Sequence, residues 1–85
     1  MYHVYLLRSD KDKSFYVGYT IDIERRLKDH NNGSVGYTKR RKPWKLVYYE
    51  TYADIEDARL REERLKVFGK AFGQLKLRIK KSLNI

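Results

Sequence analysis

The chain has 85 residues, which is enough for one small domain, and we expect a single domain over residues 1–85. It contains no cysteine, which excludes disulfide bonds and thiolate metal sites, and its hydrophobic content of 41% is above that of disordered chains. Twenty lysines and arginines against eleven aspartates and glutamates give a net charge of +9, so the predicted partner is a polyanion, nucleic acid above all.

No targeting signal is predicted at the start of the sequence. The first seven residues have neither a basic leader nor a small-residue cleavage site, so no signal peptide is predicted. No apolar run in the sequence approaches the roughly 18 residues that a membrane span requires. We therefore expect a cytoplasmic protein with no membrane partner.

Two strands joined by a polar turn are predicted first. Residues 2–8 and 15–20 are rich in β-branched, aromatic and aliphatic side chains, and residues 9–14 between them are polar. This pattern indicates a β-hairpin.

The register of the hairpin decides where two tyrosines point. If Arg8 faces Phe15, then Tyr5 faces Gly18, and Tyr5 and Tyr16 project from the same face as diagonal neighbours, about 7–8 Å apart at the backbone. Gly18 would leave open space beside the Tyr5 ring. A slip of one residue would put the two tyrosines on opposite faces.

A helix is predicted next. Asp22 can cap its N-terminus, and Gly33 lies just past its end. Ile23 and Leu27 are spaced to form its buried stripe.

Arg26 and His30 stand one turn apart on this helix and flank the buried stripe. A cation and a titratable imidazole at the edge of a sheet could meet a phosphate group and an attacking water. The alternative is an ordinary solvated helix, on which neither residue has a function.

Residues 31–43 form a long basic loop, and residues 44–52 return to strand composition. The clustered cations of this region are Lys39, Arg40, Arg41, Lys42 and Lys45. They predict sequence-independent affinity for nucleic-acid phosphates. For Trp44 we favour a place in the core over the alternative, stacking on a base.

Two further helices are predicted in the last third of the chain. Asp54 caps one that runs to about Phe68, with Gly69 at its C′ position, and residues 70–83 form the other. The apolar side of the latter consists of Phe72, Leu75, Ile79 and Leu83. The predicted fold class is α/β, a small three-stranded, mainly antiparallel sheet flanked by three helices in the order β-β-α-β-α-α.

One acid interrupts the apolar stripe of the helix that follows Asp54. Ile55, Ala58 and Leu65 share this stripe with position 62, which is a glutamate. A carboxylate on a packed face is costly unless it is paired or bound to a metal. Both interpretations of Glu62 stay open, a metal ligand or an ion pair with a nearby arginine or lysine.

These residues together resemble the GIY-YIG nuclease domains. The motifs of that family are matched in order by His3-Val4-Tyr5, Tyr16-Val17-Gly18, Arg26 with His30, and Glu62. The resemblance runs from Tyr2 to about Lys66. It is strongest to the small stand-alone bacterial members, and the sequence is more distantly similar to the N-terminal incision domain of the excision-repair protein UvrC. His at position 3 and Val in both triplets depart from the motif without touching a proposed catalytic side chain.

The resemblance implies an endonuclease that hydrolyses phosphodiester bonds, selective for structure rather than sequence, with a role in DNA repair or recombination. It implies one divalent cation, Mg²⁺ or Mn²⁺, held by Glu62. Tyr5 would activate the water, and Tyr16 would orient the water or the phosphate. Arg26 is expected to lower the pKa of Tyr5 and to hold a phosphate oxygen, while His30 shares in the proton transfer.

The expected partner is nucleic acid, DNA in preference to RNA, with a further protein partner for substrate selection left open, as is the oligomeric state. Arg25 and Lys66 are expected to join the basic loop in binding it, and whether Arg25 or Arg26 is the functional arginine stays open. The alternative function is a non-catalytic nucleic-acid-binding module of the same fold. A structural adaptor for an acidic protein is a third hypothesis, but it gives no reason for Glu62.

Overall fold

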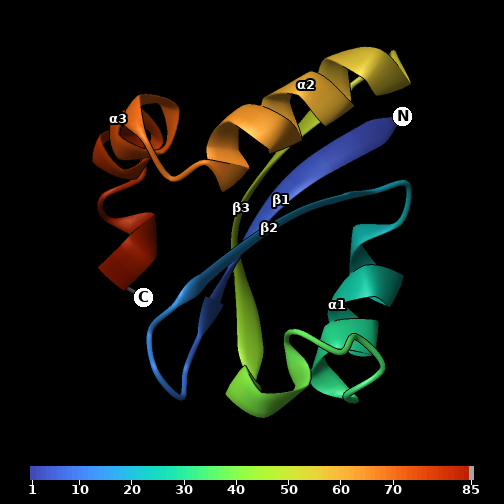
Figure 1. Cartoon of the computed structure of the whole chain (residues 1–85), viewed down its shortest axis with the longest axis vertical. Coiled ribbons are helices and arrows are strands. Elements are labelled where there is room, and N and C mark those ends of the chain that lie inside the picture. Colours follow the sequence, from blue (N-terminus) through green and yellow to red (C-terminus); the bar gives the residue numbers. More distant parts are fainter. Residues whose placement is uncertain (85) are drawn as a thin grey trace.

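A computed structural model describes residues 1–84 of the chain. Its elements in order are β1 (Tyr2–Ser9), β2 (Phe15–Thr20), α1 (Ile23–Asn31), the 3-10 turn η1 (Lys39–Arg41), β3 (Trp44–Tyr52), α2 (Ile55–Lys66), α3 (Lys70–Arg78) and the 3-10 turn η2 (Ser82–Asn84) (Figure 1). The predicted α/β class and the order β-β-α-β-α-α are therefore confirmed. Within these 84 residues, no helix combines the length and apolar character that crossing a bilayer would need.

The three strands form one antiparallel sheet in the order β2-β1-β3, with β1 in the middle. Arg8 pairs with Phe15 and Tyr5 pairs with Gly18, so the predicted hairpin register is confirmed. A β-bulge interrupts the pairing of β1 with β3 between Leu6 and Leu7. A bulge adds local twist to a strand pair.

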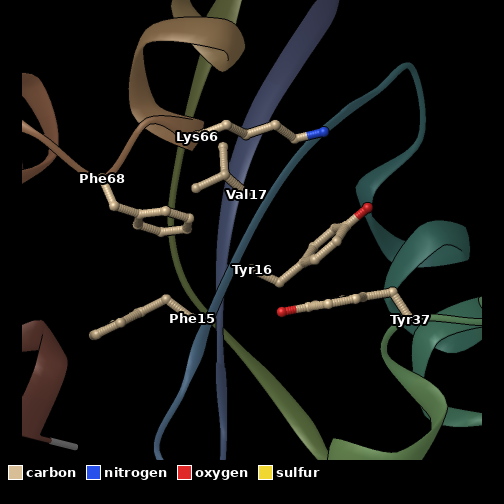
Figure 2. Close-up of a pocket in the computed structure, with 6 residues that line it drawn as sticks. All are labelled: Phe15, Tyr16, Val17, Tyr37, Lys66 and Phe68. Carbon is tan, nitrogen blue, oxygen red and sulfur yellow. The ribbon is translucent and has the colours of Figure 1, made fainter.

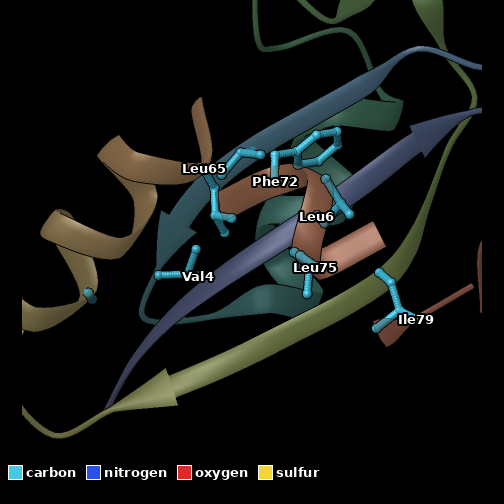
Figure 3. Close-up of a cluster of buried hydrophobic side chains, with 8 residues drawn as sticks. Val4, Leu6, Leu65, Phe72, Leu75 and Ile79 are labelled. Atoms are coloured by element: carbon cyan, nitrogen blue, oxygen red, sulfur yellow. The ribbon is translucent and has the colours of Figure 1, made fainter. Parts of the chain in front are cut away.

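The middle strand is buried on both faces because helices cover both sides of the sheet (Figure 1). Val4 and Leu6 point toward α2 and α3 and belong to the larger core, together with the side chains drawn in Figure 3. Tyr5 and Leu7 point the other way and pack in a smaller cluster beside α1. This alternation along β1 places the hydroxyl-bearing Tyr5 on the α1 face.

Helix α1 begins and ends where the sequence predicted. The Asp22 carboxylate accepts a hydrogen bond from the Arg25 backbone N–H at 3.1 Å, and Gly33 has a φ of 84°, which favours glycine. The prediction that His30 only flanks the buried stripe is wrong. His30 is fully buried and Leu27 only half-buried, because Tyr5, Tyr16 and Thr38 contact the His30 ring.

The ends of α2 and α3 differ from the prediction. Helix α2 ends at Lys66, and Phe68, with a φ of 55°, adopts the left-handed conformation that Gly69 was expected to supply. Helix α3 ends at Arg78 instead of continuing to residue 83. Its backbone leaves the helical path after that residue, and the Leu83 carbonyl accepts a hydrogen bond from the Arg8 guanidinium at 2.5 Å.

Candidate active site

A phenol and an imidazole form a hydrogen-bonded pair between the sheet and α1. The Tyr5 hydroxyl lies 2.9 Å from Nε2 of His30. Tyr5 is 2% exposed and His30 is fully buried, so water does not compete for this bond. The structure therefore brings together two of the predicted site residues, Tyr5 on β1 and His30 on α1.

Thr38, on the basic loop, completes a chain of three polar groups. Its Oγ1 lies 2.8 Å from Nδ1 of His30 and donates a hydrogen bond to the Val35 carbonyl at 3.3 Å. Because a hydroxyl has one proton, Thr38 accepts at Oγ1 from His30 Nδ1–H. The free lone pair of His30 then lies at Nε2 and faces the Tyr5 O–H.

Sequence reasoning gave Thr38 no role in this site. Thr38 is fully buried although it lies in a loop, and its carbonyl also accepts a hydrogen bond from Trp44 Nε1 at 2.9 Å. Thr38 lies within the part of the sequence that resembles the GIY-YIG nuclease domains, and no other feature of the sequence indicates a role for it. Loop residues follow no periodic pattern from which burial can be predicted.

Tyr16 lies beside the pair, as the register requires. Its ring centroid is 6.3 Å from that of Tyr5 and 4.8 Å from that of His30. Gly18 makes room for this arrangement, since a Cβ at that position would lie 2.6 Å from Cζ of Tyr5 and 3.1 Å from Cε2 of Tyr16. The open space expected at Gly18 is occupied by the Tyr5 hydroxyl end.

Arg26 is the arginine that reaches Tyr5, whereas Arg25 is exposed on the outer side of α1. The expectation that Arg26 lowers the pKa of Tyr5 is wrong in its net effect. Burial raises the pKa of Tyr5 to about 12, and the opposing hydrogen bond and positive charge of Arg26 do not compensate for it. Tyr5 therefore holds its proton at neutral pH.

The imidazole of His30 is also in its neutral form at neutral pH. Burial, together with the positive charge of Arg26, lowers its pKa from 6.5 to about 4, against a smaller opposing effect of Asp29. The resting pair is thus a neutral phenol that donates to a neutral imidazole. Such a pair can take up a proton at Nε2 of His30, which becomes an imidazolium, while the Tyr5 phenol stays neutral.

Glu62 lies on the inner side of α2 with a side chain only 16% exposed. Its carboxylate pairs with the Lys66 ammonium at 3.2 Å, and Lys66 lies 5.9 Å from the centroid of the Tyr16 ring. The negative charge of Glu62 also contributes to the high pKa of Tyr5. The ion-pair interpretation of Glu62 is therefore realised in this structure.

The donor set around Glu62 fits a hard divalent cation bound by a single carboxylate. In the described residues, no three His, Cys, Asp or Glu side chains converge to form a complete metal cage. Mg²⁺ commonly uses one or two carboxylates and completes its shell with water and substrate phosphate oxygens. The partly shielded Glu62 carboxylate, whose partner Lys66 lies near the Tyr16 ring, offers such a ligand.

The basic loop is fastened to the turn between β1 and β2. Arg41 forms an ion pair with Asp12 at 3.4 Å, and Lys45 forms one with Asp10 at 3.5 Å. The remaining cations of the loop, Lys39, Arg40 and Lys42, are exposed. Two of the five predicted phosphate-binding side chains of this region therefore already have acidic partners, as does Lys66.

Trp44 belongs to the core, and the alternative that it stacks on a base is wrong. It is 3% exposed and packs with Tyr5 and Leu7. Its backbone N–H donates to the side-chain oxygen of Asn31 at 2.6 Å. These contacts fix the start of β3 against α1 and so support the loop that carries Thr38.

Comparisons with known proteins agree with this fold. The family model described as the GIY-YIG catalytic domain matches residues 1–74. A UPF0213 protein of Clostridium perfringens is 45% identical over 67 residues, which cover 78% of this chain and 71% of that protein. A UPF0213 protein of Staphylococcus saprophyticus is 41% identical over 70 residues, covering 81% of this chain and 84% of that protein.

A solved structure is also similar. The solution NMR structure of the UPF0213 protein BH0048 from Bacillus halodurans matches with a TM-score of 0.56 and 33% sequence identity. The match covers 94% of this chain and 86% of that one. The names of these relatives state no activity.

Proposed function

This chain belongs to the GIY-YIG family of nuclease catalytic domains, and on that premise we propose that it is a metal-dependent endonuclease that hydrolyses phosphodiester bonds in DNA. Nucleic acid is the substrate class that this family implies. The observation that carries the proposal is the buried chain from Tyr5 through His30 to Thr38. It supplies a proton acceptor next to a strongly basic surface.

The same chain of groups favours catalysis over the non-catalytic binding module. Burying an imidazole and a phenol hydroxyl costs free energy, and a surface that only binds phosphates does not require these buried groups. A binder needs exposed cations, and the exposed Lys39, Arg40 and Lys42 would satisfy that need without the pair. A site that moves a proton needs the pair itself.

The proposed proton path starts at the attacking water. Tyr5 accepts a proton at Oη while its own proton passes to Nε2 of His30, across the 2.9 Å bond. Because the transfer is coupled, no phenolate has to accumulate, which agrees with a Tyr5 pKa of about 12. Thr38 keeps the second imidazole nitrogen protonated, so that Nε2 is free to receive the proton.

Arg26 and Tyr16 orient the reacting groups in this proposal. Arg26 already donates to the Tyr5 hydroxyl, and its guanidinium has further N–H donors for a phosphate oxygen. Tyr16 borders both the pair and the open surface, so its hydroxyl can position the water or the phosphate. Arg25 lies outside this cluster and contributes to binding only.

Glu62 would hold the divalent cation, Mg²⁺ or Mn²⁺, which would neutralise charge on the phosphoryl oxygens when bound. Lys66, now paired with Glu62, would then be released toward a phosphate of the substrate. The exposed cations of the basic loop would add affinity that does not depend on sequence. We further propose a preference for DNA structure over sequence and a role in repair or recombination.

A substrate panel tests the proposal. Labelled single-stranded, nicked, flapped, branched and plain duplex DNA are incubated with the protein in Mg²⁺, Mn²⁺ or EDTA, and products are separated on denaturing gels. We expect cleavage of at least one branched or nicked substrate with metal and none in EDTA. Tight binding to the panel without cleavage under any metal condition would instead support the binding module.

A further inference from the structure

A small hollow lined by aromatic rings opens on the surface beside Tyr16. This aromatic hollow has a volume of about 230 Å³ and is lined by Phe15, Tyr16, Val17, Tyr37, Lys66 and Phe68. Figure 2 shows Tyr16 and Tyr37 on one side of it, Phe68 and Phe15 on the other, and Lys66 across the top. None of the six side chains is acidic.

Two of these rings are unusually exposed. Tyr37 is 63% exposed and Phe68 is 49% exposed, although large aromatic side chains gain free energy from burial. Phe68 also has a φ of 55°, a costly conformation for a bulky residue, while the next residue is a glycine. Its packing against Phe72, with ring centroids 4.8 Å apart, holds the Phe68 ring at the mouth of the hollow.

The surroundings of the aromatic hollow are cationic. Arg41, which is also paired with Asp12, lies over the Tyr37 ring, 5.5 Å from its centroid, and Lys66, which is paired with Glu62, lies at the opposite rim. Phe15 separates the aromatic hollow from a second hollow of about 740 Å³, the cationic hollow, whose charged lining residues are Arg8, Lys70, Lys76 and Lys80. The occupant should therefore be a flat group attached to an anionic chain.

We propose that the aromatic hollow stacks one unpaired nucleobase of the bound DNA strand, next to the phosphate at which the chain is cut. The inference rests on the proposed function and adds a substrate class to it. A volume of about 230 Å³ is smaller than the roughly 300–1,000 Å³ of pockets for drug-sized ligands, and suits a single ring system. Base stacking on aromatic side chains tolerates any sequence, because every base has a π-face.

The position of Tyr16 indicates how close the stacked base would lie to the proposed proton path. Its ring borders the aromatic hollow and lies 4.8 Å from the His30 ring, so a base stacked there belongs to a nucleotide adjoining the proton path. The phosphates that follow would cross Phe15 into the cationic hollow. A base inside an intact duplex has both faces covered by its neighbours, and so the hollow selects DNA with an unpaired nucleotide at the cut.

Binding measured in EDTA tests this proposal without requiring cleavage. The probes are a duplex that ends in a single-stranded extension and the same molecule with one abasic nucleotide in the extension, placed in turn at each position. A third version carries 2-aminopurine at the position where the abasic substitution weakens binding most. We expect the base to improve affinity at least about fivefold over the abasic site, and we expect 2-aminopurine fluorescence to be quenched on binding.

Substitutions of the ring residues test whether the preference for the base arises at the aromatic hollow. Tyr37→Leu and Phe68→Leu should each abolish the preference for the base and the quenching, while affinity for the abasic molecule stays unchanged. Tyr37→Phe keeps the ring and should keep both. Tyr49→Leu is the matched control, since Tyr49 is 52% exposed but lies on β3, the strand at the opposite edge of the sheet.

Equal affinity for base and abasic probes at every position would overturn the inference, even if the protein cuts DNA. A base preference that persists in both leucine variants would also overturn the inference. The same holds if these substitutions change only self-association or peptide binding. Conversely, quenching that depends on Tyr37 and Phe68 in a protein that never cleaves would uphold the stacking site and overturn the nuclease. The two proposals therefore fail separately.

Discussion

The Tyr5 hydroxyl donates a hydrogen bond to Nε2 of His30 over 2.9 Å, from the middle strand of the sheet to the last turn of α1. Both groups are neutral at physiological pH, since burial moves the pKa of the phenol up to about 12 and that of the imidazole down to about 4. Tyr5 and His30 keep these neutral, hydrogen-bonded forms only while the groups that contact them stay in place. Changes in these partners should therefore have measurable consequences.

Thr38→Val should reduce cleavage by at least about tenfold, because the imidazole loses the acceptor that fixes its tautomer. The orphaned Nδ1–H should also lower the free energy of unfolding by about 1–3 kcal/mol. Single-turnover cleavage and urea unfolding measure the two effects. Thr38→Ser retains the hydroxyl and should stay close to wild type; equal losses in both variants would argue against the tautomer role.

Stability should fall as the pH is lowered from 6.5 toward 4. The unfolded chain protonates His30 near its ordinary pKa of 6.5, whereas the folded protein resists protonation until about pH 4, so acid favours the unfolded state. The expected loss is roughly 1–3 kcal/mol across this window. Chemical unfolding between pH 8 and pH 5 measures the slope before carboxyl groups titrate.

The second histidine provides the control for this pH dependence. His30→Gln should remove most of the slope, while His3→Gln should keep it, because His3 bonds Thr51 at a more exposed position. A slope that persists unchanged in His30→Gln would show that another group is responsible.

Gly18→Ala should damage the site more than a single methyl group suggests. The added Cβ would lie 2.6 Å from Cζ of Tyr5, so the ring must shift, which disturbs its hydrogen bond to His30. We expect a loss of about 1–3 kcal/mol in the free energy of unfolding and a clear drop in cleavage rate. Gly36→Ala, where a Cβ meets nothing within 4 Å, is the matched control.

Glu62→Gln should abolish metal-dependent cleavage and leave DNA binding intact, because the amide keeps the shape of the side chain but loses the charge that attracts the cation. Its neighbour Glu63 is exposed, so Glu63→Gln controls for a change of one charge on α2. Cleavage is followed over a titration of Mn²⁺. A Glu62→Gln protein that retains full activity would remove Glu62 from the metal site.

Much of the sheet could be predicted from the sequence, because its geometry follows from simple periodicity. The hairpin register follows from the length of one turn, and it places Tyr5 and Tyr16 on one face. The side of α2 that carries Glu62 follows equally from helical spacing. These positions depend on local geometry alone.

The properties that depend on burial by distant segments could not be predicted. Thr38 reaches His30 only because the loop folds over the end of α1. The net pKa shift of Tyr5 depends on how fully the neighbouring elements exclude water, which outweighs Arg26. Phe68 takes the left-handed conformation in place of Gly69, and its ring packs on Phe72 of the next helix.

The most direct measurement compares wild-type protein and Tyr5→Phe in single-turnover cleavage of the best substrate in Mn²⁺, with DNA affinity determined in EDTA. Removing one hydroxyl oxygen interrupts the proton path and leaves the ring in place. We predict that the cleavage rate falls by at least about 100-fold, whereas affinity changes by less than about twofold. Cleavage by Tyr5→Phe at the wild-type rate would contradict the account.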